Sequence, residues 1–117
     1  MKRTKTAVDF SVRPPTDAYS KWVETLILTS GETRIVENTL GLVGEAGEVA
    51  EKIKKKLRDG SDVKPHEIIK ELGDVVFYAT ALANAFGSSL AEVQHMNQQK
   101  LNSRKERGTL RGNGDDR

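Results

Sequence analysis

The chain of 117 residues has no cysteine, which excludes disulfide bonds and thiolate metal sites and makes the reducing cytoplasm the expected location. No stretch is apolar for long enough to form a signal peptide or to span a bilayer, so we expect no membrane partner. The formal net charge is only +2, which is too small to indicate a nucleic-acid partner. Aromatic residues make up 5% of the chain and charged residues 31%, a balance typical of a helix-rich single domain.

The turn signals along the chain predict one helical domain, residues 16–107, between two extensions. Residues 1–15 are polar and end in two prolines, and residues 108–117 are Gly-rich and charged, so both are predicted to be flexible. Hydrophobic spacing and capping residues predict helices at 16–30, 32–60, 65–86 and 90–107. The short connection at 61–64 makes the second and third helices antiparallel neighbours. We therefore predict an all-α fold, an antiparallel bundle of about four helices completed by oligomerisation.

Apolar residues recur every three to four positions along the second and third predicted helices, which predicts one buried stripe on each. Glycines at positions 41 and 44 raise the alternative of a break in the second helix, because a glycine inside a helix costs about 1 kcal/mol relative to alanine. The predicted stripes are Leu42, Ala46, Val49, Ile53 and Leu57 on the second helix, and Ile68, Leu72, Val75, Ala79, Leu82 and Phe86 on the third.

An acidic pentapeptide occurs twice, at residues 45–49 and at residues 71–75, each time in the order acid, apolar, Gly, acid, Val. In each copy the two acids stand three residues apart, which is about 60° around a helix and therefore on one face. Four carboxylates brought together repel one another unless a hard cation lies among them, and Mg²⁺ prefers oxygen ligands. We predict a site for Mg²⁺, with Mn²⁺ as the alternative, at Glu45, Glu48, Glu71 and Asp74.

The two copies occupy equivalent heptad positions on helices that are predicted to be antiparallel. Glu45 should therefore approach Glu71 across the helix pair, with Glu48 and Asp74 further out. A single pair of acids is commonly no more than a solvated helix face, but the duplication and the short connection favour a metal site. Glycines at 41, 44 and 47 lie on the same broad side of the second predicted helix as Glu48, where they would admit either a ligand or a closely packed neighbour.

With these residues in place, the sequence resembles the MazG-like nucleoside triphosphate pyrophosphohydrolases, an all-α group related to the dimeric dUTP and dCTP pyrophosphatases. The resemblance runs from about residue 16 to residue 112 and is strongest at residues 42–49, 71–75 and 100–108. It implies a Mg²⁺-dependent enzyme, usually dimeric or tetrameric, that hydrolyses a nucleoside triphosphate to monophosphate and pyrophosphate through water attack on the α-phosphorus. It also implies that the four acids are catalytic metal ligands.

The fourth predicted helix offers candidates for substrate binding. Asn97, Lys100 and Arg104 are spaced so that they share one face, and the two cations could hold the outer phosphates. A solvated basic face is the alternative. Trp22 is a candidate for stacking on the base, although an aromatic residue at helical spacing also fits a core.

Three alternatives to a nucleoside triphosphate pyrophosphohydrolase stay open. The chain could be a non-enzymatic helical interaction module whose acids only keep it in solution. It could be a phosphoribosyl-ATP pyrophosphohydrolase, which shares the helical plan. Glu92 and His95 have the spacing found in di-iron carboxylate bundles, but such bundles need two such motifs and the chain has only two histidines. The P-loop and nucleophile-elbow patterns are absent.

Overall fold

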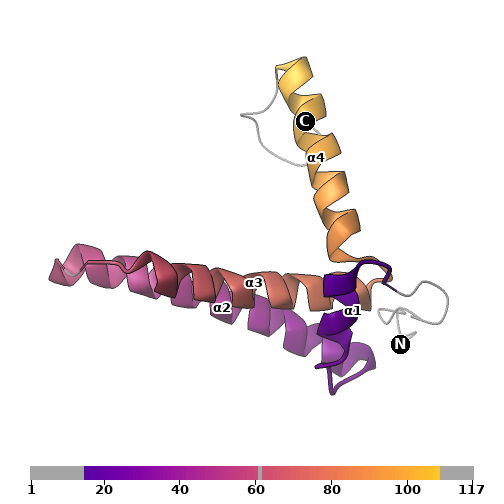
Figure 1. Ribbon diagram of the computed structural model, residues 1–117, viewed down its shortest axis with the longest axis horizontal. Helices are drawn as coiled ribbons and strands as arrows, with labels where there is room; N and C mark the ends of the chain where they lie inside the picture. Colours follow the sequence, from indigo (N-terminus) through magenta and orange to yellow (C-terminus); the bar gives the residue numbers. More distant parts are fainter. Residues whose placement is uncertain (1–14, 61, 109–117) are drawn as a thin grey trace, which may run out of the picture.

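Figure 1 shows a computed structural model of the chain, which describes residues 15–60 and 62–108. All regular structure within these ranges is helical, so the predicted all-α fold is confirmed. The predicted arm and tail lie outside the described residues, apart from Pro15 and Gly108. The helices are α1 (Ala18–Glu24), α2 (Gly31–Asp59), α3 (Pro65–Ala85) and α4 (Leu90–Arg107).

The body of the molecule is a long antiparallel hairpin of α2 and α3 (Figure 1). α2 ends where the sequence predicted, because Gly60 adopts a left-handed conformation with φ of 68° and its N–H donates to the carbonyl of Lys56. α3 begins at Pro65, whose fixed φ suits the first helical position. α2 continues unbroken through Gly41 and Gly44, so the alternative of a break is not realised. Packing against α3 outweighs the low helix propensity of these residues.

α1 is shorter than predicted, ending at Glu24 instead of near residue 30. The hydroxyl of Thr25 donates to the carbonyl of Trp22 at 2.6 Å, and the N–H groups of Leu26 and Ile27 donate to carbonyls three residues back. These tighter bonds close the last turn. The segment that follows contains Thr25, Ile27 and Thr29. Their branched side chains, and the local hydrogen bonding of threonine, weaken a helix, so the apolar spacing alone was misleading.

A buried polar network fixes α1 against the hairpin. Glu24 forms a two-pronged ion pair with the buried Arg34 of α2, and the Arg34 guanidinium also donates to the carbonyl of Ala81 in α3 at 3.0 Å. The side-chain amide of Asn84 donates to Glu24 at 3.1 Å and to the carbonyl of Ser20 at 3.0 Å. Because three helices contribute groups to one network, the position of α1 on the hairpin is strongly specified.

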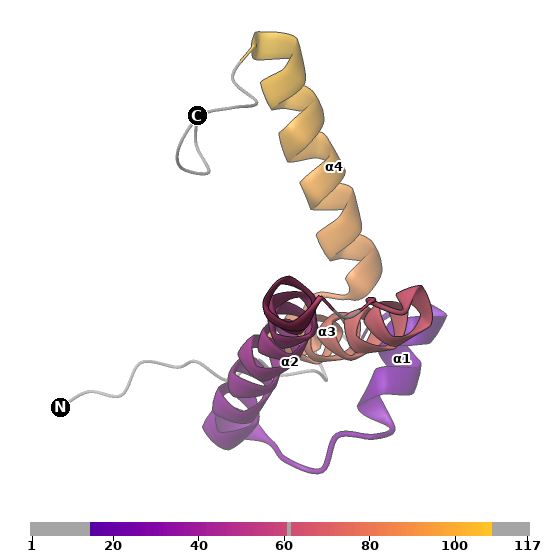
Figure 2. The same ribbon diagram turned by 90° about the vertical axis from the view of Figure 1, so that its left-hand side faces the viewer.

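α4 projects away from the hairpin, as the two perpendicular views in Figures 1 and 2 show. The Ser89 hydroxyl accepts a hydrogen bond from the N–H of Glu92 at 3.1 Å and so caps the start of α4. The N–H of Leu90 donates to the Ser20 hydroxyl at 2.8 Å, which ties the start of α4 to α1. Within the described residues α4 contacts α3 and α1 but not α2.

A single chain buries little apolar surface. Leu57 of the predicted α2 stripe is 83% exposed, and Ala46, Ile53, Leu72 and Phe86 are exposed as well. The prediction that these positions are buried is therefore wrong within one chain, because a pair of helices covers only the sides that face each other. None of the described helices is both long and apolar enough to cross a membrane. The buried apolar residues of the described part are Val23, Ala81 and Ala85.

Candidate metal and nucleotide site

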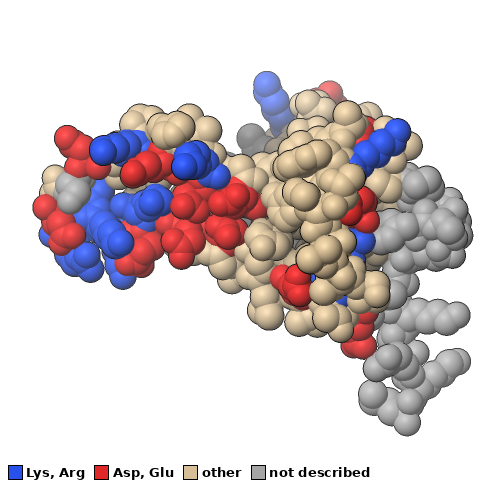
Figure 3. All heavy atoms as spheres, turned by 60° about the horizontal axis from the view of Figure 1, so that its bottom comes forward, with Lys and Arg blue, Asp and Glu red and all other residues tan. Residues whose placement is uncertain are grey.

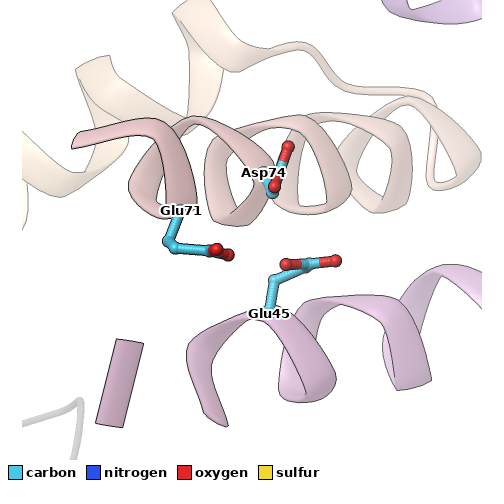
Figure 4. A group of neighbouring side chains, drawn as sticks. All are labelled: Glu45, Glu71 and Asp74. Carbon is cyan, nitrogen blue, oxygen red and sulfur yellow. The ribbon is translucent and has the colours of Figure 1, made fainter. Parts of the chain in front are cut away.

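Three carboxylates from two helices meet on one side of the hairpin. Glu45 of α2 and Glu71 and Asp74 of α3 each offer one oxygen, and these oxygens lie within 4.8 Å of one another. Figure 4 shows Glu45 and Glu71 reaching toward each other from the two facing helices. Glu45 and Glu71 are half-buried and Asp74 is exposed, so the group is fixed at its base and open to a ligand.

The register of the hairpin decides which acids meet. The ring of Tyr78 packs against Gly41, and in an antiparallel pair each step along α2 is matched by a step back along α3. Glu45 is therefore level with Asp74, which explains why Asp74 belongs to the group instead of lying further out. Glu48 is exposed and lies outside the three-residue group, although it remains close enough to influence Glu45.

The acids act on one another electrostatically. Partial burial raises the pKa of Glu45, and the charges of Asp74 and Glu71, a hydrogen bond with the Glu71 side chain and the charge of Glu48 raise that pKa further. Partial burial and the charge of Asp74 likewise raise the pKa of Tyr19. A cation among the carboxylates would remove the repulsion that produces the shift in Glu45.

The chemistry of the group fits a hard divalent cation. Within the described residues it is the one cluster of three or more metal-ligating side chains, and all its members are carboxylates. Oxygen-only ligation suits Mg²⁺ or Mn²⁺. Neither His66 nor His95 belongs to it, so the Glu92 and His95 spacing on α4 does not build the nitrogen-containing site of a di-iron bundle.

An aromatic pocket of about 540 Å³ adjoins the carboxylates on the side of α1. Trp22 is 51% exposed, and its ring centre lies 5.6 Å from that of Tyr19 and 6.3 Å, edge to face, from that of Phe77. Trp22 is therefore held in place by other rings while about half of its surface stays accessible. The pocket is lined by Tyr19, Trp22, Leu26, Glu45, Gly73, Asp74, Phe77 and Tyr78.

Two pocket residues were missed by the sequence analysis, although the spacing contains the signal. Phe77 and Tyr78 follow Asp74 by three and four residues, which places them on the same side of α3. Gly41 is explained by Tyr78, because a Cβ atom at position 41 would overlap the tyrosine ring. A Cβ atom at Gly44 would meet nothing within 4 Å, so close packing within the chain does not explain that glycine.

The remaining candidates lie on α4, and one chain does not bring them to the carboxylates. Asn97 is exposed and lines a shallow polar pocket of about 450 Å³ on α4 itself. Lys100 is half-buried and Arg104 is buried. Because α4 projects away from the hairpin (Figure 2), these side chains could reach acids only in another arrangement or in a second copy of the chain.

Known proteins resemble the chain over the part that contains the carboxylates. A family model described as the MazG nucleotide pyrophosphohydrolase domain matches residues 35–109. The Gene 37 protein of Mycobacterium phage L5 is 49% identical over 83 residues, which cover 68% of this chain and 73% of that protein. No solved structure shows a significant match.

Proposed function

The chain belongs to the MazG nucleotide pyrophosphohydrolase family, and from this premise we propose that it is a Mg²⁺-dependent nucleoside triphosphate pyrophosphohydrolase. The match confirms the resemblance first seen in the two acidic motifs. In the proposed reaction a water oxygen bonds to the α-phosphorus of an NTP or dNTP, the bond from that phosphorus to the oxygen bridging to the β-phosphorus breaks, and monophosphate and pyrophosphate leave. The observation that carries the proposal is the carboxylate group inside the matched residues.

We expect Glu45, Glu71 and Asp74 to hold the Mg²⁺ or Mn²⁺ ion, and Glu48 to add a fourth carboxylate from the next turn of α2. When bound, the ion supplies a Lewis acid that counters the negative charge on phosphate oxygens. The protein positions the carboxylates, because two helices hold them at a fixed separation. Without the ion the carboxylates repel one another, and relief of this repulsion favours binding of the cation.

The aromatic pocket supports the proposal that Trp22 binds the base, together with Tyr19. Stacking of a base on an aromatic side chain contributes about 1–3 kcal/mol and tolerates different bases. The pocket shares Glu45 and Asp74 with the carboxylate group, so a nucleotide with its base in the pocket would have its phosphates beside the acids.

We further propose that the active form is a homodimer or homotetramer. The exposed apolar residues of α2 and α3 support this, because monomeric proteins rarely leave large apolar surfaces open to water. A second copy could also bring the α4 of one chain to the carboxylates of the other, which is how Asn97, Lys100 and Arg104 would take part in phosphate binding. The cytoplasmic location expected from the lack of cysteine stays a prediction.

Product analysis tests the proposal directly. The full chain is incubated with a panel of NTPs, dNTPs and phosphoribosyl-ATP, with Mg²⁺ or with chelator, and the products are separated. We expect monophosphate and pyrophosphate, lost with chelator and in Asp74→Asn. Glu37→Gln is the matched control, because it removes an exposed acid of α2 that lies outside the carboxylate group.

The other outcomes are equally informative. Diphosphate and orthophosphate as products would mean that water attacks the γ-phosphorus, which contradicts the proposed reaction. Turnover confined to phosphoribosyl-ATP would identify the narrower alternative enzyme. No turnover, together with a melting temperature that Mg²⁺ does not change, would favour the interaction module.

A further inference from the structure

The side of α2 that faces away from α3 carries an apolar stripe along most of the helix. Successive members stand alternately four and three residues apart, which is the spacing with which helices pack along one another in coiled coils. Val36, Leu40 and Val43 are each more than half exposed, and Gly47 and Ala50 are exposed as well. We call this surface the outer stripe. Its members are Val36, Leu40, Val43, Gly47, Ala50, Lys54 and Leu57, and all except Lys54 are apolar or glycine.

The outer stripe and the hairpin contact lie on opposite sides of α2. Val43 stands two residues before Glu45, which is about 200° around the helix, and Glu45 points toward α3 (Figure 4). Among the described helices α2 packs along α3 alone. From Val36 to Leu57 the stripe is about 32 Å long and about 10 Å wide. An apolar surface of this extent on a water-exposed helix is typical of an interaction site.

We propose that the outer stripe is a contact between two copies of the chain, in which α2 of one copy packs antiparallel along α2 of the other about a twofold axis. Overlap of the stripe with itself then sets Val36 beside the partner's Leu57 and Val43 beside the partner's Ala50, with Gly47 near the axis. This assignment adds a surface to the oligomer proposed above, and it does not depend on the proposed reaction.

The two ends of the stripe are complementary in shape. A pocket of about 530 Å³ lies at the N-terminal end, where it is lined by Glu32, Thr33, Val36, Glu37 and Leu40. Leu57 projects from the other end, so an antiparallel partner would insert its leucine into this pocket, and the twofold axis would fill both pockets alike. A Cβ atom at Gly47 would meet nothing within 4 Å, so two backbones can approach closely at the axis.

Charge favours the antiparallel direction. Residues 31–39 hold two acids and one cation, the buried Arg34 that is paired with Glu24. Residues 50–59 hold five cations and two acids. Figure 3 shows Lys and Arg gathered at the free end of the hairpin, which is the C-terminal end of α2. A parallel pair would set like charges together at both ends, whereas an antiparallel pair sets acids beside cations.

The competing occupant from a second copy is α4. Its exposed large apolar residues run from Val93 through Met96 to Leu101. They extend over about 12 Å of helix, which is much shorter than the outer stripe. α4 would therefore leave most of the stripe in contact with water, whereas a second α2 has the same length and the same spacing.

The first test measures the mass of the full chain in solution by sedimentation equilibrium. Leu40→Lys is compared with the wild type and with Ile69→Lys. Ile69 is the matched control, because it lies on α3 and is 66% exposed, as Leu40 is. Leu40→Lys should halve the mass and weaken self-association by at least about tenfold, since a charge replaces a buried apolar side chain. Ile69→Lys should leave the mass unchanged, and melting temperatures check that both variants are folded.

The second test reads the direction of packing, and the absence of native cysteine makes it specific. Single cysteines are introduced and treated with a short bifunctional maleimide. Gly47→Cys should link to itself. Val36→Cys and Leu57→Cys should not link to themselves, because the two copies of each lie about 32 Å apart, but a mixture of these two variants should form a linked dimer.

Four results would overturn the assignment. They are a monomeric wild type, an equal loss of mass in Ile69→Lys, self-linking of Val36→Cys, which would mean a parallel pair, and linking of Val36→Cys to Met96→Cys in place of Leu57→Cys, which would put the partner's α4 on the stripe. Mass and linking are read without substrate. Failure of this contact is therefore distinct from failure of the proposed reaction, which product analysis measures.

Discussion

The ion pair between Glu24 and Arg34 should be the largest single polar contribution to the placement of α1. Arg34 is 5% exposed, and Glu24→Gln removes the carboxylate charge beside it while keeping the shape of the side chain. Removing one partner of a buried pair costs about 3–5 kcal/mol, and we expect the lower value because the Glu24 side chain is 26% exposed. At roughly 4 °C per kcal/mol for a chain of this size, the melting temperature should fall by about 12 °C.

Calorimetry and urea unfolding measure this change, and a double-mutant cycle isolates the pair. Arg34→Met should be destabilising alone, but Glu24→Gln with Arg34→Met should be more stable than the sum of the two losses predicts, by about 1–3 kcal/mol. Because α1 carries Trp22, Glu24→Gln should also weaken binding of a nucleoside monophosphate. A loss below about 1 kcal/mol, or additive losses in the cycle, would refute the role assigned to the pair.

Three further predictions concern the hairpin and the helix cap. Gly41→Ala should destabilise the chain by about 1–3 kcal/mol in urea unfolding, because its Cβ atom would overlap the Tyr78 ring. Gly44→Ala, whose Cβ atom would meet nothing within 4 Å, should instead stabilise α2 by up to about 1 kcal/mol. Equal effects of the two substitutions would contradict the packing of Tyr78 on Gly41. Mg²⁺ should raise the wild-type melting temperature, by the equivalent of about 2.7 kcal/mol of stability when its concentration is a hundred times the dissociation constant. Glu45→Gln should reduce that rise, and an undiminished rise in this variant would place the ion elsewhere. Burial alone would raise the pKa of Asp17, but hydrogen bonds from the Ser20 N–H and hydroxyl and from the Ala91 N–H outweigh burial and lower this pKa. The stability that the carboxylate provides is therefore present above its unfolded pKa of about 3.9 and is lost as the pH falls through the lower folded value. Asp17→Asn should lack that loss, and parallel acid-unfolding curves for both proteins would contradict the assignment.

The sequence predicted the parts of the fold that depend on local backbone chemistry. Gly60 marks the end of α2 because glycine readily adopts the left-handed conformation that ends a helix. Pro65 marks the start of α3 because proline is favoured at the first helical position. Ser89 marks the start of α4 through its hydroxyl. The end of α1 could not be predicted in this way, because the apolar spacing continued past Glu24 while the backbone turned.

The sequence predicted less about features that depend on how helices meet. Heptad positions indicated that Glu45 and Glu71 face each other, but the membership of Asp74 depends on the register, which Tyr78 sets by packing on a glycine. The placement of α4 depends on its anchor to Ser20, seventy residues away in sequence, and spacing along one helix carries no information about such a contact. Leu57 was expected to be buried because periodicity shows that a face is apolar without showing what covers it.

α2 runs as one uninterrupted helix from Gly31 to Asp59, and it carries both the glycine that receives Tyr78 and the glutamate that α2 contributes to the carboxylate group. The position of Glu45 opposite α3 therefore depends on the number of residues between Gly41 and Glu45. One residue inserted between them would turn Glu45 by about 100° around the helix axis, away from Glu71 and Asp74, without altering any side chain. An insertion of seven residues would restore the direction of Glu45 but move it about 10 Å along the axis. The carboxylate group should therefore be more sensitive to changes in the length of α2 than to substitutions on the exposed side of this helix.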